Sequence, residues 1–303
     1  MLGIAALGLA ALIFAAPAGA PGTLALFRTE TPEAKILFVG DMFFDRHIRL
    51  MMERHGEDQP FSCLGGLFSG ADLVVGNLEG PITGSPSVSA GTEPGSPDNF
   101  RFTFPVGTAE LLSSHGVSVV NLGNNHLGNF GLAGIASTKH HLAEAGVGYF
   151  GGLSEEDMVY RIELEDMRFS FVSHNEFGGP DAETVAQAVA AERGVGPTVI
   201  VYAHWGDEYV EAPLRVRAAA ELFAQAGATL IIGSHPHVVL ASERVGGALV
   251  YWSLGNFIFD QYWNEEVSRG LAVAATFGED GTLRTQEHPV EMLRDGRTCP
   301  IML

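Results

Sequence analysis

Short runs of β-branched and aromatic residues alternate with helical patterns along this chain, and this alternation restricts its fold more than any other feature. Continuous apolar runs of this length are typical of strands that are buried on both faces. The expected strands are Ile36–Val39, Leu73–Val75, Val117–Asn121, Phe169–Ser173, Thr198–Ala203, Thr229–Ile232 and Ala248–Ser253. Helices are expected at Thr108–His115, Gly131–Ala145, Asp181–Ala191 and Pro213–Gln225. The alternation predicts a layered α/β domain.

The pattern changes after Asp260, where two further strands are expected at Arg269–Phe277 and His288–Leu293. The residues Glu279-Asp280-Gly281 between them are typical of a hairpin turn. Residues 83–101 are rich in Ser, Gly and Pro, which predicts a mobile surface loop. No internal repeat or domain boundary is evident after residue 35, so we expect residues 36–303 to form one domain.

The N-terminus carries an apolar run, Leu2–Ala16, followed by the small residues Ala18-Gly19-Ala20. Its length and the small residues suit a cleaved signal peptide, although no basic residue precedes it. If Pro17 is tolerated, the run extends to Phe27 and suits an uncleaved membrane anchor. A misassigned start or a buried helix is the third alternative. We therefore expect residues 1–27 to be a signal peptide or anchor, residues 28–35 to be a linker, and the domain to be extracytoplasmic, either exported or membrane-anchored.

Only two cysteines, Cys63 and Cys299, are present. Their number and spacing exclude a CxxC metal or redox motif and allow one disulfide. An exported protein would permit that bridge, but two free thiols are equally compatible with the sequence.

The charge is strongly acidic, with 17 basic and 36 acidic residues and a formal net charge of −19. Proteins that bind nucleic acid by neutralising its backbone need clustered Lys and Arg, so we expect no nucleic-acid partner. The overall field also repels anions, so any anionic ligand must be attracted locally.

Polar side chains follow six of the expected strands directly. In open α/β sheets, ligands bind at the carboxyl edge of the strands. Each residue alone could be an ordinary loop residue, but six such strand ends together indicate a site. These side chains are Asp41, Asn77, Glu79, Asn121, Asn124, Asn125, His126, His204, Asp207, Glu208, His235, His237 and Asn256.

This set contains imidazoles, carboxylates and amides but no thiolate, a mixture that suits Mn, Zn or Fe. His235-Pro236-His237 is expected to be extended, which would direct both imidazole rings to the same side. The candidate metal ligands are Asp41, Glu79, Asn125, His204, His235 and His237.

Taken in order, the motifs resemble those of the CapA family of poly-γ-glutamate capsule synthesis proteins, a branch of the calcineurin-like metallophosphatase superfamily. The resemblance extends from about Ile36 to about Gln261. The motifs that carry it are Gly40-Asp41 with Arg46, Gly76–Pro81, Asn121–His126, His204–Tyr209, Gly233–His237 and Ser253–Gln261.

The resemblance implies a four-layer α/β/β/α sandwich with one or two divalent ions at the strand ends. It assigns Asp41 and His237 to a first metal, Glu79 to the bridging position, and Asn125, His204 and His235 to a second metal. Two such ions could clamp a phosphoryl group. His126 resembles the histidine that protonates a leaving group.

Further residues of these motifs are candidate substrate contacts. Arg46 is expected to act in catalysis and to bind a phosphate or carboxylate, with a surface ion pair as its alternative. Trp205 and Tyr209 could instead belong to the core, and Asn256 and Asp260 could hold the loop. The candidate substrate-binding residues are Arg46, Asn124, Trp205, Glu208 and Asn256.

The chain also departs from the superfamily pattern. Phe43 stands where the first motif has a histidine ligand, and Asn77 stands where the second has an aspartate, with Glu79 as its substitute. These changes predict a mononuclear or weakly held first site, unless Asp45 or His47 replaces the missing ligand. Asn129 stands where the family often has an aspartate near the motif histidine.

The resemblance implies a membrane-associated protein that helps make, export or release poly-γ-glutamate, with a metal site of hydrolase type acting on phosphoester or amide bonds. One alternative is a non-catalytic accessory subunit that binds the polymer or a membrane synthase. Another is an envelope phosphoesterase with no capsule role, because fold and motif do not determine the substrate.

Overall fold

The computed structural model describes residues 32–301. The expected signal peptide or anchor, and residues 28–31 of the expected linker, lie outside these residues. Residues 33–35 of the linker belong to β1 (Glu33–Met42), because Ala34 is already packed in the core and Glu33 already pairs with β12. Between residues 32 and 301, no helix combines the length and apolar character needed to cross a bilayer.

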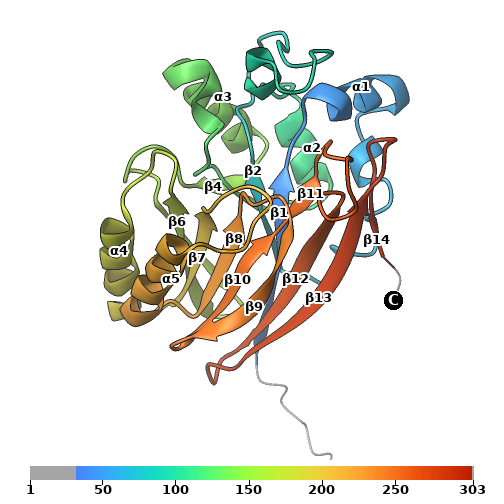
Figure 1. Cartoon of the computed structure of the whole chain (residues 1–303). Helices are drawn as coiled ribbons and strands as arrows, with labels where there is room; N and C mark the ends of the chain where they lie inside the picture. The colour runs from blue at the N-terminus through green and yellow to red at the C-terminus, as the bar shows by residue number, and fades with distance from the viewer. Residues whose placement is uncertain (1–31, 302–303) are drawn as a thin grey trace, which may run out of the picture. The chain divides into compact units, whose positions relative to one another are not determined.

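Two sheets form the centre of the domain (Figure 1). In the eight-stranded sheet, β11 (Asn256–Ile258) pairs with β1 beside the main path. That path is β14 (Thr298–Pro300), β13 (Leu283–Met292), β12 (Arg269–Gly278), β1, β2 (Leu73–Leu78), β3 (Val119–Asn121) and β4 (Gly148–Phe150). The six-stranded sheet has the order β5 (Val159–Leu164), β6 (Met167–Asn175), β7 (Thr198–His204), β8 (Leu230–Ser234), β10 (Ala248–Leu254) and β9 (Val239–Val245).

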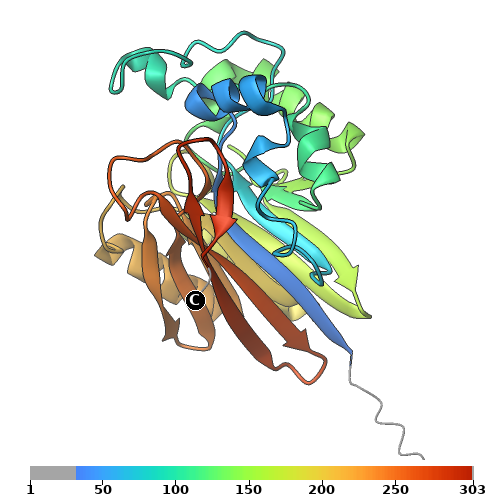
Figure 2. The ribbon, with the colours of Figure 1, turned by 90° about the vertical axis from the view of Figure 1, so that its right-hand side faces the viewer.

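Helices cover each sheet on its outer side. Figure 1 shows α4 (Ala182–Gly194) and α5 (Leu214–Ala226) together against the six-stranded sheet. Figure 2 shows the blue and green helices grouped near the other sheet: α1 (Arg46–His55), α2 (Thr108–Ser114) and α3 (Gly131–Glu144). Three short 3₁₀ helices complete the domain: η1 (Gln59–Phe61), η2 (Pro97–Phe100) and η3 (Leu127–Phe130).

The alternation of side chains along β1 explains why its sequence is continuously apolar. Ile36 and Phe38 point between the two sheets, whereas Leu37 and Val39 pack in the cluster that contains residues of α1, α2 and α3. A third apolar cluster lies between the six-stranded sheet and α4 and α5. The expected four-layer α/β/β/α sandwich is therefore confirmed.

Each expected strand and helix is present, with shifted ends, and the hairpin turn joins β12 to β13 as expected. Helix α1 was not expected, because its apolar positions are few and lie among charged residues. The strands β4, β5, β9, β11 and β14 were also missed; three of them are only three residues long, and β5 and β9 carry exposed polar residues.

The expected mobile loop at residues 83–101 makes definite contacts. Ser89 is buried and its hydroxyl donates to Asp45 Oδ2 at 2.9 Å, and Asn99 contacts the guanidinium of Arg46. These contacts hold the loop over the start of α1.

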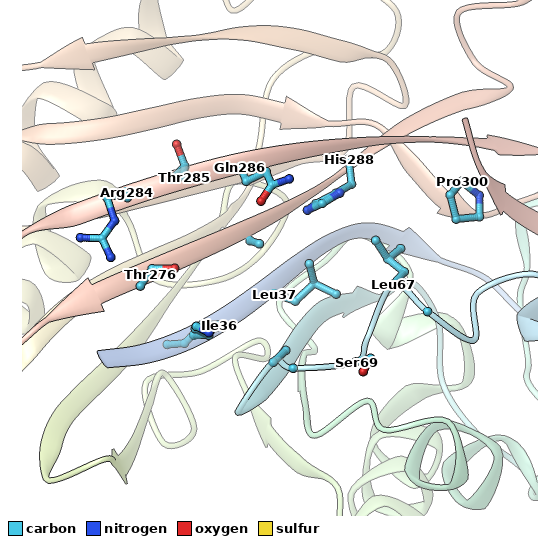
Figure 3. A pocket seen from close by; sticks show the side chains of 15 residues that line it. Ile36, Leu37, Leu67, Ser69, Thr276, Arg284, Thr285, Gln286, His288 and Pro300 are labelled. Carbon is cyan, nitrogen blue, oxygen red and sulfur yellow. The ribbon is translucent and has the colours of Figure 1, made fainter. Parts of the chain in front are cut away.

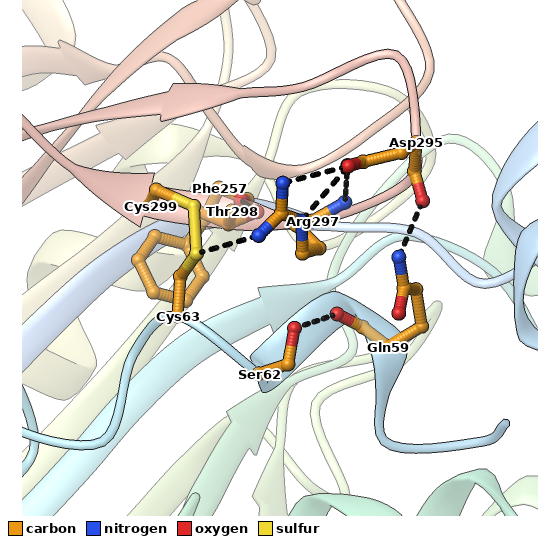
Figure 4. Close-up of a disulfide and its surroundings, with 8 residues drawn as sticks. All are labelled: Gln59, Ser62, Cys63, Phe257, Asp295, Arg297, Thr298 and Cys299. Atoms are coloured by element: carbon orange, nitrogen blue, oxygen red, sulfur yellow. Dashed lines mark hydrogen bonds and ion pairs between the residues drawn. A yellow bond between two sulfur atoms is a disulfide. The ribbon is translucent and has the colours of Figure 1, made fainter. Parts of the chain in front are cut away.

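Cys63 and Cys299 form a disulfide, so the pairing left open by the sequence is realised (Figure 4). The bond ties β14 to the turn that follows η1. Beside it, Gln59 Nε2 donates to the carbonyl oxygen of Asp295 at 2.9 Å. The C-terminal strand is thereby attached to a segment far away in the sequence.

Candidate metal centre

The carboxyl ends of β1, β2, β3, β7 and β8 meet at one edge of the sandwich, where the sequence placed the site. Asp41 lies on β1 and is in register with Asn77 on β2 and Asn256 on β11. Gly40 precedes Asp41 because a Cβ there would lie 1.9 Å from the carbonyl oxygen of Gly255. The close approach allows Asp41 N–H to donate to that same oxygen at 3.1 Å.

Asp41, Glu79 and His237 form a buried group whose ligand atoms all lie within 4.8 Å of one another. His237 Nε2 is 3.7 Å from Glu79 Oε1, and His237 Nδ1 is 3.5 Å from Asp41 Oδ2. Both carboxylate oxygens of Glu79 are buried without a hydrogen-bond partner. Buried polar atoms are normally satisfied, so these oxygens and the mixed O/N donor set fit a divalent cation such as Mn, Zn or Fe.

Hydrogen bonding fixes which nitrogen of His237 is available. Nδ1 lies 2.9 Å from the amide oxygen of Asn256, which can only accept, so we assign the proton to Nδ1. The lone pair is then on Nε2, which faces Glu79. This is the orientation that a metal-binding imidazole requires.

Asn125, His204 and His235 form a second group beside the first. Asn125 Oδ1 lies 3.0 Å from His204 Nε2, and the rings of His204 and His235 are 4.8 Å apart. His235 Nδ1 is buried without a partner. Asp41 joins the two groups, because its Oδ1 is 4.0 Å from His204 Nδ1 and its Oδ2 accepts from His235 N–H at 3.2 Å.

The expected extended conformation of His235-Pro236-His237 is wrong. His235 and His237 have φ angles of +94° and +57°, in the region that L-residues rarely adopt. The rings still lie 5.9 Å apart, because the bonds to Asp41 and Asn256 hold both residues in place. Such strain costs roughly 1–3 kcal/mol per residue and is concentrated at functional sites.

The two departures from the superfamily pattern have clear structural consequences. Phe43 is buried against Phe102 and Phe259, with ring centroids 4.7 Å away in each case, and supplies no ligand atom. Asn77 Nδ2 donates to Asp41 Oδ1 at 2.7 Å. An amide at this position therefore supports Asp41 with a donor, where an aspartate would repel it.

Neither proposed substitute takes the place of the missing ligand. Asp45 caps α1 and accepts from Ser89 and from the backbone N–H groups of Arg46 and Thr103. His47 Nε2 lies 2.7 Å from the carbonyl oxygen of Arg294. Both side chains are used elsewhere.

Arg46 lies close to the centre but is already paired. Its guanidinium binds the carboxylate of Asp260 and stacks over the rings of Phe43 and Phe102, at 4.6 and 5.0 Å. Its charge acts to lower the pKa of Glu79, although this is a small effect beside burial. The ion pair of Arg46 is mostly buried and is not a surface pair, and its expected role in catalysis and ligand binding stays a prediction.

His126 is oriented by the residue that departs from the family. Its Nδ1 donates to Asn129 Oδ1 at 3.2 Å, and its ring packs on Phe102. Its Nε2 lies 4.0 Å from Glu79 Oε1. An amide oxygen therefore holds this ring in the absence of a carboxylate.

Three expected substrate contacts, Asn124, Trp205 and Asn256, have side chains that are enclosed within the protein, and their role in substrate binding stays a prediction. Asn124 is buried; its Nδ2 donates to the carbonyl oxygen of Leu78 at 2.8 Å and its Oδ1 accepts from His126 N–H at 3.0 Å. Trp205 packs in the core, and its Nε1 donates to the carbonyl oxygen of Trp252. Asn256 is buried and positions His237.

Glu208 is exposed near the centre, and its charge acts to raise the pKa of Glu79. Its role as a substrate contact stays a prediction. Two residues of the same motifs that were given no role support the ligands: Ser234 Oγ lies 2.9 Å from His204 Nδ1, and Asn121 Nδ2 donates to Asn77 Oδ1 at 3.1 Å. Their position within the motifs was the available signal.

Burial dominates the electrostatics of the centre. It raises the pKa of Asp41 to about 7 and that of Glu79 well above its usual range, because the charged forms are poorly solvated. It lowers the pKa of His126 and His235 to about 4 and that of His237 to about 3. A bound divalent cation would reverse this preference and favour the carboxylate forms.

A cavity of about 710 Å³ lies on the outer face of β1, β12 and β13, away from the edge that carries the candidate ligands (Figure 3). Leu37, Thr276 and His288 line it, and so does Arg284, which pairs with Glu33. None of the candidate ligands reaches it, so volume alone is a poor guide to the site.

Known proteins resemble this chain in sequence and fold. It is 27% identical over 292 residues to the PGA biosynthesis protein CapA of Bacillus subtilis, covering 88% of this chain and 75% of that protein. It is 26% identical over 294 residues to the capsule biosynthesis protein CapA of Bacillus anthracis, covering 90% and 70%. The crystal structure of a phosphatase from Mycoplasma pneumoniae shares the fold, with a TM-score of 0.53, 17% identity, and coverage of 86% of this chain and 95% of that one. Residues 35–261 match the family model described as bacterial capsule synthesis protein PGA_cap, and the protein belongs to this family.

Proposed function

We propose that the protein acts outside the cytoplasm, exported or membrane-anchored, in the synthesis, export or release of poly-γ-glutamate. We further propose that its metal centre hydrolyses a phosphoester or amide bond in that process. The membership of the PGA_cap family and the two CapA relatives support the capsule role. The observation that carries the hydrolytic role is the buried group of Asp41, Glu79 and His237, with two carboxylate oxygens that lack partners.

The residues of the centre suit distinct tasks. Asp41, Glu79 and His237 would hold a first divalent ion, and Asn125, His204 and His235 would hold a second. Such an ion supplies Lewis acidity, which stabilises negative charge on the group being cleaved. His126 holds one proton on Nδ1 against Asn129, which leaves Nε2 as the atom that exchanges a proton with a leaving group.

Arg46 orients the ligand in this proposal. Its guanidinium is fixed by Asp260 and by the aromatic rings, so an anionic group that binds next to it meets a preorganised donor. The disulfide supports the extracytoplasmic location, because such bonds persist mainly in oxidising compartments.

A second candidate function is that of an accessory subunit, which binds the polymer or a membrane synthase without catalysis. Phe43 favours it, because the aromatic cluster removes one ligand of the superfamily's first metal. An envelope phosphoesterase without a capsule role is the third possibility. Both retain the same metal-binding residues.

Elemental analysis after loading with Mn or Zn, together with hydrolysis assays on a phosphodiester and a γ-glutamyl peptide, tests the proposal. We expect one or two ions per chain, lost in His237→Ala and retained in the matched control His140→Ala, whose side chain is exposed on α3. A protein that binds no metal refutes the hydrolytic role. A protein that binds metal but cleaves neither substrate favours the accessory role.

A further inference from the structure

A second cavity, of about 630 Å³, opens next to the metal centre where β9 lies beside β12, and residues of β13 also line it. Its walls are mostly apolar and come from both sheets: Val239 and Leu240 from one, Leu271 and Pro289 from the other. We refer to it as the inter-sheet groove. It contains none of the candidate metal ligands, so the hydrolytic chemistry alone does not account for it.

A chain of hydrogen bonds connects the inter-sheet groove to the metal centre. Tyr209 lines the groove, and its ring lies 6.2 Å from the ring of His237. Its hydroxyl accepts from Gln261 Nε2 at 3.1 Å, Gln261 accepts from Asn256 Nδ2 at 3.1 Å, and Asn256 accepts from His237. Tyr209 also has a φ of +65°, with its N–H bonded to the carbonyl oxygen of Pro236. The groove therefore begins at a preorganised residue beside a metal ligand.

Exposed apolar side chains surround this end of the groove. Trp263 is 61% exposed and contacts the ring of Tyr209 edge-on, with centroids 5.6 Å apart. Val239, 40% exposed, and Val210 lie on the groove itself. Adjacent exposed apolar residues of this kind mark binding surfaces more often than scattered ones do.

The charges on the rim limit what can bind. Four glutamates line the inter-sheet groove: Glu211, Glu265, Glu266 and Glu287. The one cation among its lining residues, Arg269, is paired with Glu265. A γ-glutamyl chain carries a carboxylate on every residue and would be repelled along this path. A hydrocarbon chain has no such conflict and matches the apolar walls.

We infer that the inter-sheet groove binds the hydrocarbon chain of a phosphate monoester whose phosphate lies at the metal centre, that is, a lipid-linked phosphate. The inference rests on the proposed metal centre for the phosphate and on the groove alone for the chain. The phosphate meets the metal ligands and Arg46, and the chain leaves past Tyr209 and Trp263 between the sheets.

Alkylphosphonates test this, because hydrolysis does not cleave their carbon–phosphorus bond. Binding of methyl-, butyl- and octylphosphonate to the Mn-loaded protein is measured by calorimetry. Each buried methylene strengthens binding by about fourfold, so partial burial of the longer chain predicts at least about tenfold tighter binding of octyl- than of butylphosphonate. Trp205 and Trp252 are buried, so a ligand-induced shift in tryptophan emission that is absent in Trp263→Phe reports on the groove.

Val239→Glu places a charge on the groove and should weaken octylphosphonate binding at least about tenfold without changing methylphosphonate binding. Val195→Glu is the matched control, at a position 65% exposed after α4, and should change neither. Equal binding of butyl- and octylphosphonate, or equal effects of the two variants, would overturn the inference. If methylphosphonate does not bind, the proposed metal centre is refuted. The groove is tested separately, by comparing the binding of butyl- and octylphosphonate. Preferential binding of a γ-glutamyl oligomer that Val239→Glu weakens would assign the groove to the polymer and overturn the lipid.

Discussion

Replacing Glu79 with glutamine should stabilise the metal-free protein and at the same time remove its response to metal. Glu79 is fully buried, both of its carboxylate oxygens lack hydrogen-bond partners, and Asp41 lies close by. Such an arrangement lowers the stability of the metal-free protein, and a bound ligand would compensate for it. Residues that serve a site often lower stability in the absence of their ligand.

The magnitude follows from the state of this carboxyl group. An unpaired buried carboxylate costs several kcal/mol, so the folded metal-free protein retains the proton, and the pKa of Glu79 is raised well above its usual range. The unfolded chain ionises near pH 4.5, so the folded state loses stability as pH rises above that value. Glutamine removes this loss and leaves a buried amide that costs about 1–3 kcal/mol. We expect a net gain of about 1–3 kcal/mol at pH 8, shrinking towards pH 5.

Urea unfolding in the presence of EDTA at pH 8 and pH 5 measures this gain. With Mn at about 100 times its dissociation constant, the wild-type protein should gain about 2.7 kcal/mol and Glu79→Gln should gain nothing. Glu221→Gln, on the exposed side of α5, is the matched control and should behave like the wild type. A Glu79→Gln protein that is less stable than the wild type in EDTA, or that still gains stability from Mn, would show that the reasoning is wrong.

Three further predictions follow from other parts of the domain. Replacing both Cys63 and Cys299 with serine opens a loop of 236 residues in the unfolded chain and should lower the free energy of urea unfolding by up to about 5 kcal/mol. Dithiothreitol should lower it by the same amount in the wild type, and two titratable thiols before reduction would contradict the disulfide. His174 is buried against Phe223 and its pKa is lowered to about 4, so below pH 6.5 the unfolded chain binds a proton that the folded protein does not bind. Between pH 7 and pH 5, the unfolding free energy of His174→Leu should therefore fall by about 2 kcal/mol less than that of the wild type, and equal falls would refute this. Asn77→Asp replaces the donor to Asp41 with a like charge and should lower the melting temperature in EDTA but much less in Mn, whereas an equal loss in both would argue against metal at this position.

The sequence predicts the layers of the fold well, because a strand that is buried on both faces has an unbroken run of apolar residues. Along β1, Ile36 and Leu37 are both buried although they point to opposite sides of the sheet. The strands that were missed are short or lie at an edge, where one exposed face breaks the run. Helix α1 was missed for a related reason: its start is set by the cap Asp45 and its buried residues are few.

The sequence predicted which residues gather at the candidate site, but not which of them are ligands and which only support the ligands. Asp41, Glu79 and His237 were expected to be ligands and do converge. Asn124 and Asn256 belong to the same motifs, yet their amides hold the loops that present the ligands. A motif records that a residue is needed at a site, and the direction of its side chain depends on backbone angles that the sequence does not encode locally.

The charge of the protein determines how an anionic ligand could approach the centre. The net charge of −19 repels anions at long range, and the positive charge of Arg46 beside the centre is partly offset by its pairing with Asp260. The buried carboxyl groups of Asp41 and Glu79 add no attraction of their own, and the neutral histidines beside them add little. A divalent ion would therefore be the main source of positive potential at this edge, acting in a low-dielectric setting where its field is weakly screened. Anion binding by this domain should accordingly depend on metal far more than on its surface charge, and added salt should help it by screening the repulsion outside the centre.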